Sequence, residues 1–276
     1  MKIVVYGLGI IGASLCASLK RAGHTVFGKN RSREPVEYAL SHRMIDGETV
    51  DYRNADVVFL ALPPAVTMRE LAEGDFPEGC IVCDICGVKE PIERTVYSSP
   101  RRYRYVGAHP MAGKATTGIR SAAETLFDNA NLVLVRAPQT DEAALQTIYA
   151  LARDMRFGRV VECGAAEHDK MIALTSQLAH IVSSAYVKSP LTEHAVGFTG
   201  GSFQDMTRVA PMEERVWTEL FLLNREPLLS ELERVQTHLK EYAEAIAAGD
   251  EERVRALIRD GKGYHSRFFS RDDGEI

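Results

Sequence analysis

The sequence is poor in three features that mark large classes of proteins: cysteine, long basic runs and long apolar runs. The longest apolar stretch beyond the N-terminal segment, residues 55–66, is too short to cross a bilayer and contains Pro63 and Pro64. The formal net charge is −5, from 33 Lys and Arg against 38 Asp and Glu. We therefore expect no membrane partner and no nucleic acid partner, although small anions can bind locally.

The cysteines do not indicate a disulfide framework or a metal site. There are five of them, an odd number, so free thiols are expected. Cys80, Cys83 and Cys86 match the first three ligands of a bacterial ferredoxin motif, but Glu90 stands at the fourth position. Residues 80–84 also have the pattern of a strand, in which side chains three residues apart point to opposite faces. We therefore expect no iron–sulfur cluster and no metal.

The first half of the chain alternates between predicted strands and helices. Residues 2–6 predict a buried strand, residues 10–21 a helix and residues 25–27 a second strand, which together form a βαβ unit. This alternation predicts an α/β fold with a mostly parallel sheet covered by helices. Further strands are expected at 57–62, 80–84, 105–108, 132–135 and 160–161.

Beyond Cys163 the predicted strands stop and the pattern becomes helical. We expect a second, all-helical domain over residues 164–276, with residues 1–163 forming the first domain. Within 228–248, apolar residues recur at alternating steps of four and three, which is the spacing of a helix-packing seam. That stripe either faces a core within one subunit or forms a subunit interface. Helices are expected at 167–188, 213–224, 228–248 and 251–260.

A glycine motif follows the first strand directly and opens the first helix. Gly7, Gly9 and Gly12 have the spacing that permits a tight turn, close approach of the backbone to a pyrophosphate, and helix packing on the sheet. With Ile10 and Ile11 they predict a dinucleotide site of the Rossmann type, with phosphate at the helix N-terminus. A purely structural turn is the alternative.

Residues 1–19 also resemble a signal peptide, because Lys2 precedes an apolar stretch with small residues. Cleavage would remove the glycine motif, so we expect the segment to be retained and the protein to be cytoplasmic.

The end of the second strand indicates which dinucleotide binds. NAD-preferring enzymes usually have Asp or Glu there, which repels a 2′-phosphate. This chain instead has Lys29, Asn30, Arg31 and Ser32, which form a plausible 2′-phosphate site. NADP is therefore the first choice and NAD the second; a solvated basic turn is the alternative.

One histidine stands between glycines after the predicted strand 105–108. His109, in the run Gly-Ala-His-Pro-Met-Ala-Gly, is expected in an irregular loop inside the dinucleotide-binding domain. Because histidine titrates near neutrality, it can take a proton from a substrate hydroxyl while a nicotinamide takes a hydride. The alternative is a loop histidine that caps a backbone carbonyl.

Three further segments complete a recognisable pattern. His168-Asp169 precedes Thr-Ser-Gln-Leu-Ala-His at 175–180, and Gly-Ser-Phe-Gln-Asp-Met-Thr-Arg-Val-Ala follows at 201–210, with Trp217 and Asn224 downstream. Together with the glycine-flanked His109, this resembles the prephenate and arogenate dehydrogenase family of tyrosine biosynthesis. The resemblance implies an N-terminal Rossmann domain, a C-terminal helical domain that makes a homodimer, and a substrate cleft between them.

The resemblance also implies a reaction and roles for individual residues. The reaction is oxidative decarboxylation of prephenate to 4-hydroxyphenylpyruvate, with hydride transfer to NAD(P). His109 matches the histidine that binds the ring hydroxyl, and Arg208 matches an arginine that binds a substrate carboxylate. His180, Ser176 and Trp217 match residues of the substrate pocket. Each has a structural alternative: core packing for His180 and Trp217, an ion pair with Asp205 for Arg208, and helix capping for His168-Asp169.

The chain departs from the family pattern at two positions. Gly87 stands where many members have a serine that hydrogen-bonds the catalytic histidine, so that hydroxyl is missing. Lys114 stands after the histidine segment, where a small hydroxyl residue is common, and adds a cation near the expected substrate side chain or lies in solvent.

Other functions fit the sequence less well. Arogenate dehydrogenase, which forms tyrosine directly, is the main alternative because its substrate differs only at the side chain. A β-hydroxyacid dehydrogenase would need a catalytic lysine in a glycine-rich helix motif, which we do not find. The absence of the serine at Gly87 motivates a more remote alternative, a nonenzymatic dinucleotide-sensing dimer.

Overall fold

The computed structural model describes residues 1–113, 116 and 118–272. They form two compact units, Met1–Arg225 and Glu226–Ile276. All the candidate site residues lie in the first unit, except that Lys114 falls outside the described residues. The unit boundary lies later than 163/164, the position at which strands give way to helices.

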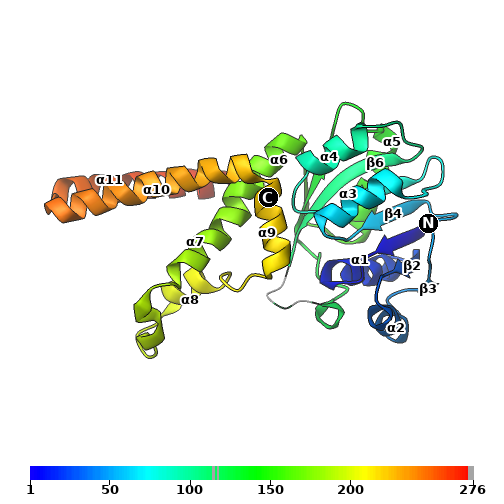
Figure 1. The fold of residues 1–276 in the computed structure, drawn as a ribbon, viewed down its shortest axis with the longest axis horizontal. Helices are drawn as coiled ribbons and strands as arrows, with labels where there is room; N and C mark the ends of the chain where they lie inside the picture. Colours follow the sequence, from blue (N-terminus) through cyan, green and yellow to red (C-terminus); the bar gives the residue numbers. More distant parts are fainter. Residues whose placement is uncertain (114–115, 117, 273–276) are drawn as a thin grey trace. The chain divides into compact units, whose positions relative to one another are not determined.

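The first unit is built on one sheet, which has eight strands in the described residues (Figure 1). The strand order is β3-β2-β1-β4-β5-β6-β7-β8. Every neighbouring pair is parallel except β6 and β7, which are antiparallel. The predicted mostly parallel α/β sheet is thus confirmed. The strands are β1 (Lys2–Tyr6), β2 (Thr25–Lys29), β3 (Gly47–Glu48), β4 (Val57–Leu60), β5 (Ile81–Asp84), β6 (Arg104–Met111), β7 (Asn131–Val135) and β8 (Arg159–Cys163).

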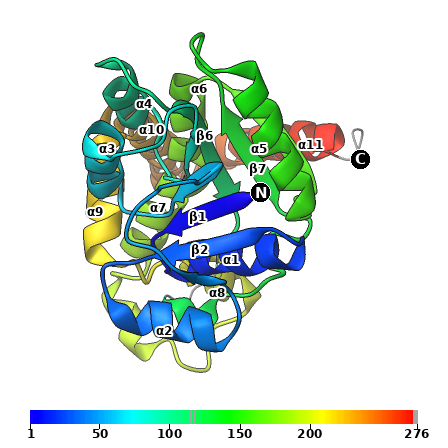
Figure 2. The ribbon, with the colours of Figure 1, turned by 90° about the vertical axis from the view of Figure 1, so that its right-hand side faces the viewer.

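Helices cover both faces of this sheet, as Figure 2 shows with α3 and α4 on one side and α1 and α5 on the other. Each face has its own apolar core. Because both faces are covered, the central strands β4 and β5 are buried at every residue, as expected of parallel strands in this architecture. These helices are α1 (Ile10–Arg21), α2 (Arg33–Ser41), α3 (Pro64–Glu73), α4 (Glu90–Tyr97) and α5 (Glu142–Asp154).

The prediction that Cys80 and Cys83 point to opposite faces of the sheet is confirmed by these two cores. Cys83 belongs to the core on the α1 and α5 side, whereas Cys80 and Cys86 belong to the core on the α3 and α4 side. Burial raises the pKa of all three thiols. In the described part of the chain, no three side chains of the metal-binding types come together.

The prediction that His109 lies in an irregular loop is wrong. His109 lies inside β6 and not in an irregular loop, because β6 continues to Met111 while pairing with β7. Gly107 pairs with Val135 and Met111 with Asn131 in that antiparallel ladder. Glycine and proline favour turns locally, but β7 supplies hydrogen-bond partners to the backbone of β6 and so keeps residues 107–111 extended.

Helices dominate after β8, as predicted. A π-helical segment, η2 (Ala173–Leu178), joins α6 (Ala165–Ile172) to α7 (Ala179–Tyr186), and α8 (Gly201–Thr207) and α9 (Glu214–Leu223) follow. The second unit contains most of α10 (Arg225–Ala248) and all of α11 (Glu251–Asp272). The prediction ended α11 too early, at residue 260.

The stripe on α10 is not a uniform core. Leu228 is buried, but Leu239 and Ile246 are 61% and 66% exposed.

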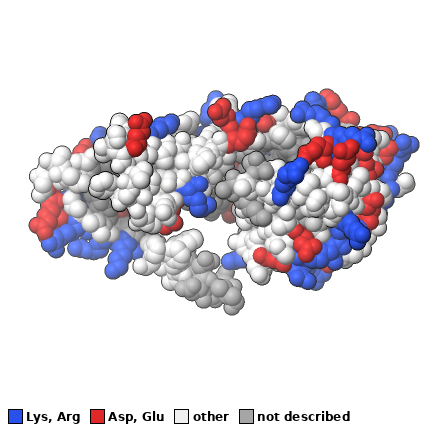
Figure 3. Space-filling model, turned by 90° about the horizontal axis from the view of Figure 1, so that it is seen from below, with Lys and Arg blue, Asp and Glu red and all other residues white. Residues whose placement is uncertain are grey.

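None of the helices that the structure describes has the length and apolar character needed to cross a bilayer. Figure 3 shows basic and acidic side chains side by side on the face that it draws.

The sheet order also determines where ligands can approach. The order reverses at β1, which lies between β2 and β4, and such a reversal opens a crevice at the carboxyl ends of the strands. The glycine motif follows β1 and position 87 follows β5 at this same edge. β6 is parallel to β5 and extends past the end of β5, so it carries His109 to that edge as well.

Candidate active site

The glycine motif has the backbone geometry of a dinucleotide cradle. Gly7 has φ +99° and a Cβ there would lie 2.1 Å from the carbonyl oxygen of Ala61. A Cβ on Gly12 would lie 1.8 Å from the carbonyl oxygen of Gly7. A Cβ on Gly9 would meet nothing within 4 Å, so this glycine leaves open space at the N-terminus of α1. Two glycines are therefore required by the fold, and the third leaves room for a phosphate group.

Asn30 holds this loop against the end of β2. Its side-chain oxygen accepts a hydrogen bond from the backbone N–H of Leu8 at 3.0 Å, inside the glycine motif. Its side-chain amide donates to the carbonyl oxygen of Ser32 at 2.9 Å. Asn30 thus fixes the loop and does not offer both of its polar atoms to a ligand.

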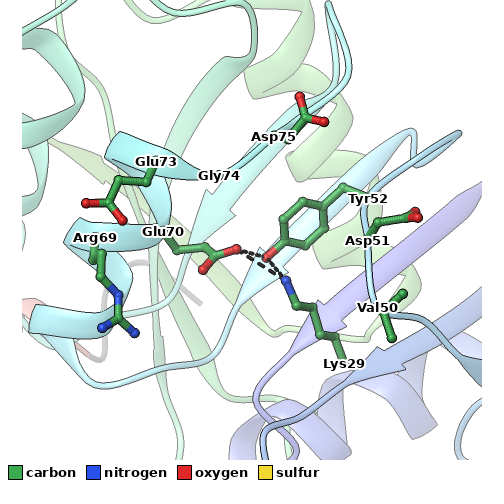
Figure 4. Close-up of a pocket in the computed structure, with 9 residues that line it drawn as sticks. All are labelled: Lys29, Val50, Asp51, Tyr52, Arg69, Glu70, Glu73, Gly74 and Asp75. Atoms are coloured by element: carbon green, nitrogen blue, oxygen red, sulfur yellow. Dashed lines mark hydrogen bonds and ion pairs between the residues drawn. The ribbon is translucent and has the colours of Figure 1, made fainter.

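The two cations of the basic turn have different surroundings. Lys29 points into a pocket of about 310 Å³ (Figure 4), where its ammonium lies 3.3 Å from a carboxylate oxygen of Glu70. The ammonium also lies over the rings of Tyr6 and Tyr52, at 4.5 and 4.3 Å from their centroids. Arg31 is exposed and has no ion-pair partner among the described residues. Of the two, Arg31 is the cation left available for a phosphate.

His109 is the end of a chain of three polar side chains. Its Nδ1 lies 2.9 Å from Nε2 of His168, and Nδ1 of His168 lies 2.7 Å from Oδ1 of Asp169. His168 and Asp169 are almost completely buried, whereas His109 is partly exposed. Nε2 of His109 has no partner among the described residues and is therefore the atom available to a ligand.

Burial lowers the pKa of His109 well below the ordinary histidine value, and the nearby His168 ring and the Lys89 ammonium lower it further. Burial also lowers the pKa of His168, partly opposed by its hydrogen bond to Asp169. At neutral pH both imidazoles are therefore uncharged. A neutral imidazole with a free nitrogen can accept a proton, which is the requirement for a general base.

The cation that affects both histidines is itself fully buried. Lys89 places its ammonium 2.6 Å from Oδ1 of Asp84, and neither side chain is exposed. The other oxygen of Asp84 accepts a hydrogen bond from the hydroxyl of Tyr105 at 2.6 Å. The backbone N–H of Cys86 donates to Oδ1 at 2.9 Å. The buried carboxylate is thus fully hydrogen-bonded, as a buried charge must be.

Asp169 has a second contact that the sequence did not reveal. Its two carboxylate oxygens accept hydrogen bonds from the backbone N–H groups of Lys89 and Glu90, at 2.8 and 2.9 Å. These N–H groups belong to the N-terminus of α4, so Asp169 caps a different helix from its own. The expectation that His168-Asp169 caps its own helix is wrong, because α6 begins after Gly164 without a side-chain cap and Asp169 lies inside that helix.

Gly87 lies next to the free face of His109. A Cβ at position 87 would be 3.6 Å from Cε1 and 3.7 Å from Nε2 of His109, and 3.5 Å from Leu220. These are ordinary contact distances, so a side chain fits there and glycine is not required by packing.

The predicted pocket residues His180 and Trp217 lie together. Their ring centroids lie 3.8 Å apart, with the ring planes tilted by 33°, so helix α7 contacts helix α9 at this point. Nδ1 of His180 lies 2.8 Å from the carbonyl oxygen of Ser176. Because a carbonyl oxygen only accepts, Nδ1–H of His180 is the donor. All three side chains are partly exposed, so they are not buried core residues.

Arg208 lies at the C-terminal end of α8 and is exposed. It makes no ion pair with Asp205 or with any other described residue, so the structural alternative is not observed.

Helix α9 is joined to the sheet domain by polar contacts. The Glu219 carboxylate accepts a hydrogen bond from the backbone N–H of Ala65, at the N-terminus of α3. The Asn224 amide donates to the carbonyl oxygen of Asp169 and to the side chain of Gln177, both at 2.8 Å. These contacts hold α9, the helix that carries Trp217, against the segment that carries His168 and His180.

Comparison with known proteins places the chain in a family. The family described as prephenate dehydrogenase, nucleotide-binding domain, matches residues 15–161, and the prephenate dehydrogenase dimerization domain matches residues 164–260. A prephenate dehydrogenase of Lactococcus lactis is 30% identical over 278 residues, covering 95% of this chain and 75% of the relative. The chain belongs to the prephenate dehydrogenase family.

Solved structures agree with this assignment. The arogenate dehydrogenase of Synechocystis is 27% identical, with a TM-score of 0.79, and the match covers 97% of this chain and 100% of that one. The prephenate dehydrogenase of A. aeolicus, solved with hydroxyphenyl propionate and NAD+, has a TM-score of 0.84 at 24% identity, covering 97% and 98% of the two chains. The latter likeness concerns the fold alone. Binding of NAD or NADP by the N-terminal domain follows from the family.

Sequence reasoning undervalued three residues of this site. The sequence favours a helix cap for His168 and Asp169, although a histidine beside an aspartate is also a residue pair that can orient another histidine. Glu219 gave no recognisable signal, because its partner is a backbone N–H far away in the sequence.

Substitution of the glycines should separate folding from cofactor binding. Gly12→Ala should destabilise the protein, because its Cβ would overlap the carbonyl oxygen of Gly7. Gly9→Ala should retain the wild-type melting temperature but bind dinucleotide at least about 10-fold more weakly, because the methyl group occupies the open space at the helix N-terminus. Thermal unfolding and fluorescence titration with NADP and NAD measure the two effects; unchanged affinity in Gly9→Ala would contradict the cradle.

The lowered histidine pKa values predict acid sensitivity. Below pH about 6.5 the unfolded chain takes up protons that folded His109 and His168 do not, so the free energy of unfolding should fall as the pH drops from that value toward the folded pKa values. Each group contributes at most about 1.4 kcal/mol per pH unit. Urea unfolding at fixed protein concentration should show a weaker pH dependence in His109→Gln, with exposed His194→Gln as the control variant. Equal slopes for wild type and His109→Gln would show that folding does not lower this pKa.

Proposed function

We propose that this protein is a prephenate dehydrogenase, which oxidatively decarboxylates prephenate to 4-hydroxyphenylpyruvate with reduction of NAD(P). The observation that carries the proposal is the free Nε2 of neutral His109, at the sheet edge where the glycine cradle also lies. A general base and a dinucleotide site at one edge are the two parts that oxidation of a ring hydroxyl requires.

The proposed chemistry assigns each side chain one task. His109 accepts the proton of the ring hydroxyl at Nε2. The nicotinamide, when bound, accepts the hydride from C4 of the ring, and loss of the ring carboxylate as CO₂ leaves an aromatic product. Arg208, exposed and without an ion-pair partner among the described residues, is proposed to bind a substrate carboxylate, because guanidinium groups bind carboxylates with two parallel hydrogen bonds.

His180, Ser176 and Trp217 are proposed to line the substrate pocket, since the three are grouped and partly exposed. Lys114 keeps its predicted role near the substrate side chain, but lies outside the described residues. Arogenate is the alternative substrate, because the Synechocystis neighbour acts on it and the two substrates share the ring.

We propose a homodimer formed by the helical domain, residues 164–276, with residues 1–163 as the dinucleotide-binding domain. The family match to a dimerization domain supports this. So does the α10 stripe, because Leu239 and Ile246 are largely exposed in the single chain. This favours the subunit interface over the internal core as the use of the stripe.

For the cofactor we propose a preference for NADP, with the 2′-phosphate near Arg31 and Ser32. Arg31 supports this preference because its guanidinium is exposed and unpaired among described residues. Lys29 supports it less directly, since its ammonium already faces Glu70 and two tyrosine rings. Asn30 contributes by fixing the backbone of the turn. Gly7, Gly9, Ile10, Ile11 and Gly12 are proposed to hold the pyrophosphate.

His109→Asn should lower kcat by roughly 100-fold or more, the usual contribution of a general base, while NADP affinity stays nearly unchanged. Steady-state assays of wild type and variant with prephenate and arogenate, each with NADP and NAD, measure this. In wild type, kcat/KM should be constant at neutral pH and fall only well below pH 6.5, the ordinary histidine pKa, because the lowered pKa of His109 keeps the base neutral to more acidic pH. Near-normal turnover by the variant would exclude His109 as the base, and turnover of arogenate alone would establish the alternative substrate.

Arg31→Ala should lower kcat/KM for NADP by roughly 10-fold or more, because a charge-assisted hydrogen bond to phosphate is lost, and should leave NAD almost unaffected. Arg33→Ala is the matched control, since Arg33 is also exposed but is paired with Glu37 at 2.7 Å. A wild-type protein that prefers NAD, or equal losses for both cofactors, would show that the turn is only solvated.

A further inference from the structure

The hydrogen-bonded chain behind His109 determines which of its ring nitrogens carries hydrogen. Asp169 accepts two backbone N–H bonds and offers only acceptors to His168, so Nδ1 of His168 must carry the hydrogen at their 2.7 Å contact. In a neutral imidazole the other nitrogen is then an acceptor. Nε2 of His168 therefore accepts at its 2.9 Å contact with His109.

The same argument continues into the ring of His109. Since Nε2 of His168 accepts, Nδ1 of His109 must be the donor and carry the hydrogen. Nε2 of a neutral His109 is then left with a lone pair on its free side, next to Gly87. The opposite tautomer would place two acceptors against each other at 2.9 Å and is disfavoured.

Position 87 makes this arrangement important in this chain. Gly87 has no hydroxyl, although a side chain there would contact Nε2 of His109. Among the described residues, the contact with His168 is the side-chain hydrogen bond that orients the His109 ring. Asp169 is in turn held by the N-terminus of α4, so the orientation is anchored to backbone.

We propose that His168 and Asp169 are positioning residues that hold His109 as the tautomer with a free Nε2, and that in this chain they replace a hydroxyl at position 87 as the group that orients the base. The part of this proposal that concerns turnover rests on the proposed function. The part that concerns the tautomer does not, because it can be measured in the protein without substrate.

The tautomer is measured by nitrogen NMR of protein labelled with [15N]histidine, at about pH 8, where ordinary histidines are neutral. The signal of His109 among the eight histidines is identified by its loss in His109→Gln. The wild-type ring should carry hydrogen on Nδ1. A ring protonated on Nε2 overturns the proposal.

The variants of His168 test the source of the tautomer. His168→Leu removes the acceptor and should give a mixture of tautomers and a kcat at least roughly 10-fold lower, with a smaller change in KM. His168→Gln retains an acceptor near the same place and should restore much of the Nδ1–H tautomer and much of the wild-type kcat. The control is His24→Leu, which removes a histidine paired with Asp154 at 2.9 Å elsewhere in the same unit and should change neither. An unchanged tautomer and unchanged kcat in His168→Leu overturn the proposal.

A double-mutant comparison tests the link to position 87. Gly87→Ser fits sterically and supplies a hydroxyl beside Nε2, so the loss caused by His168→Leu should be clearly smaller in that background. Equal losses in the two backgrounds would overturn the idea that the pair replaces the hydroxyl. If wild type turns over neither prephenate nor arogenate while His109 has the expected tautomer, the proposed function fails and the positioning role stands.

Discussion

The carboxylate of Asp169 is the interaction on which the candidate site depends. It accepts hydrogen bonds from two backbone N–H groups at the start of α4 and faces Nδ1 of His168. A carboxylate at a helix N-terminus is favoured by the helix dipole, so the same contact that holds α6 against α4 also determines the hydrogen-bonding state of two histidines. Fold stability and the orientation of His109 therefore depend on one side chain.

A buried ion pair lies close to this interaction and affects the charge of both histidines. Lys89 and Asp84 form an ion pair without solvent exposure, and breaking such a pair by removing one partner typically costs about 3–5 kcal/mol. Lys89 also lowers the pKa of both His109 and His168. A buried ion pair is weak evidence for stability, but here its cation favours neutral imidazoles and so keeps a proton acceptor available at neutral pH.

The two ends of the site are built on different kinds of element. The glycine cradle and His109 lie at the carboxyl edge of a rigid sheet, whereas Trp217 and His180 come from helices joined to that sheet by side-chain hydrogen bonds. Glu219 contacts the N-terminus of α3 and so ties the helix that carries Trp217 to the helix after β4. Hydrogen bonds of this kind connect the helices that carry Trp217 and His180 to the sheet that carries the glycine motif.

The sequence by itself determined the α/β sheet, the glycine cradle and the helical second half, because periodicity and glycine spacing are local properties. It also predicted His109 as the candidate base, but placed it in a loop, because the strand β7 that keeps it extended is paired through tertiary structure. The same reason explains the different surroundings of Lys29 and Arg31, since Glu70 and Tyr52 approach Lys29 from distant segments. Only the tertiary structure could show that His168 and Asp169 lie behind His109, because a hydrogen bond between residues 59 positions apart leaves no periodic trace in the chain.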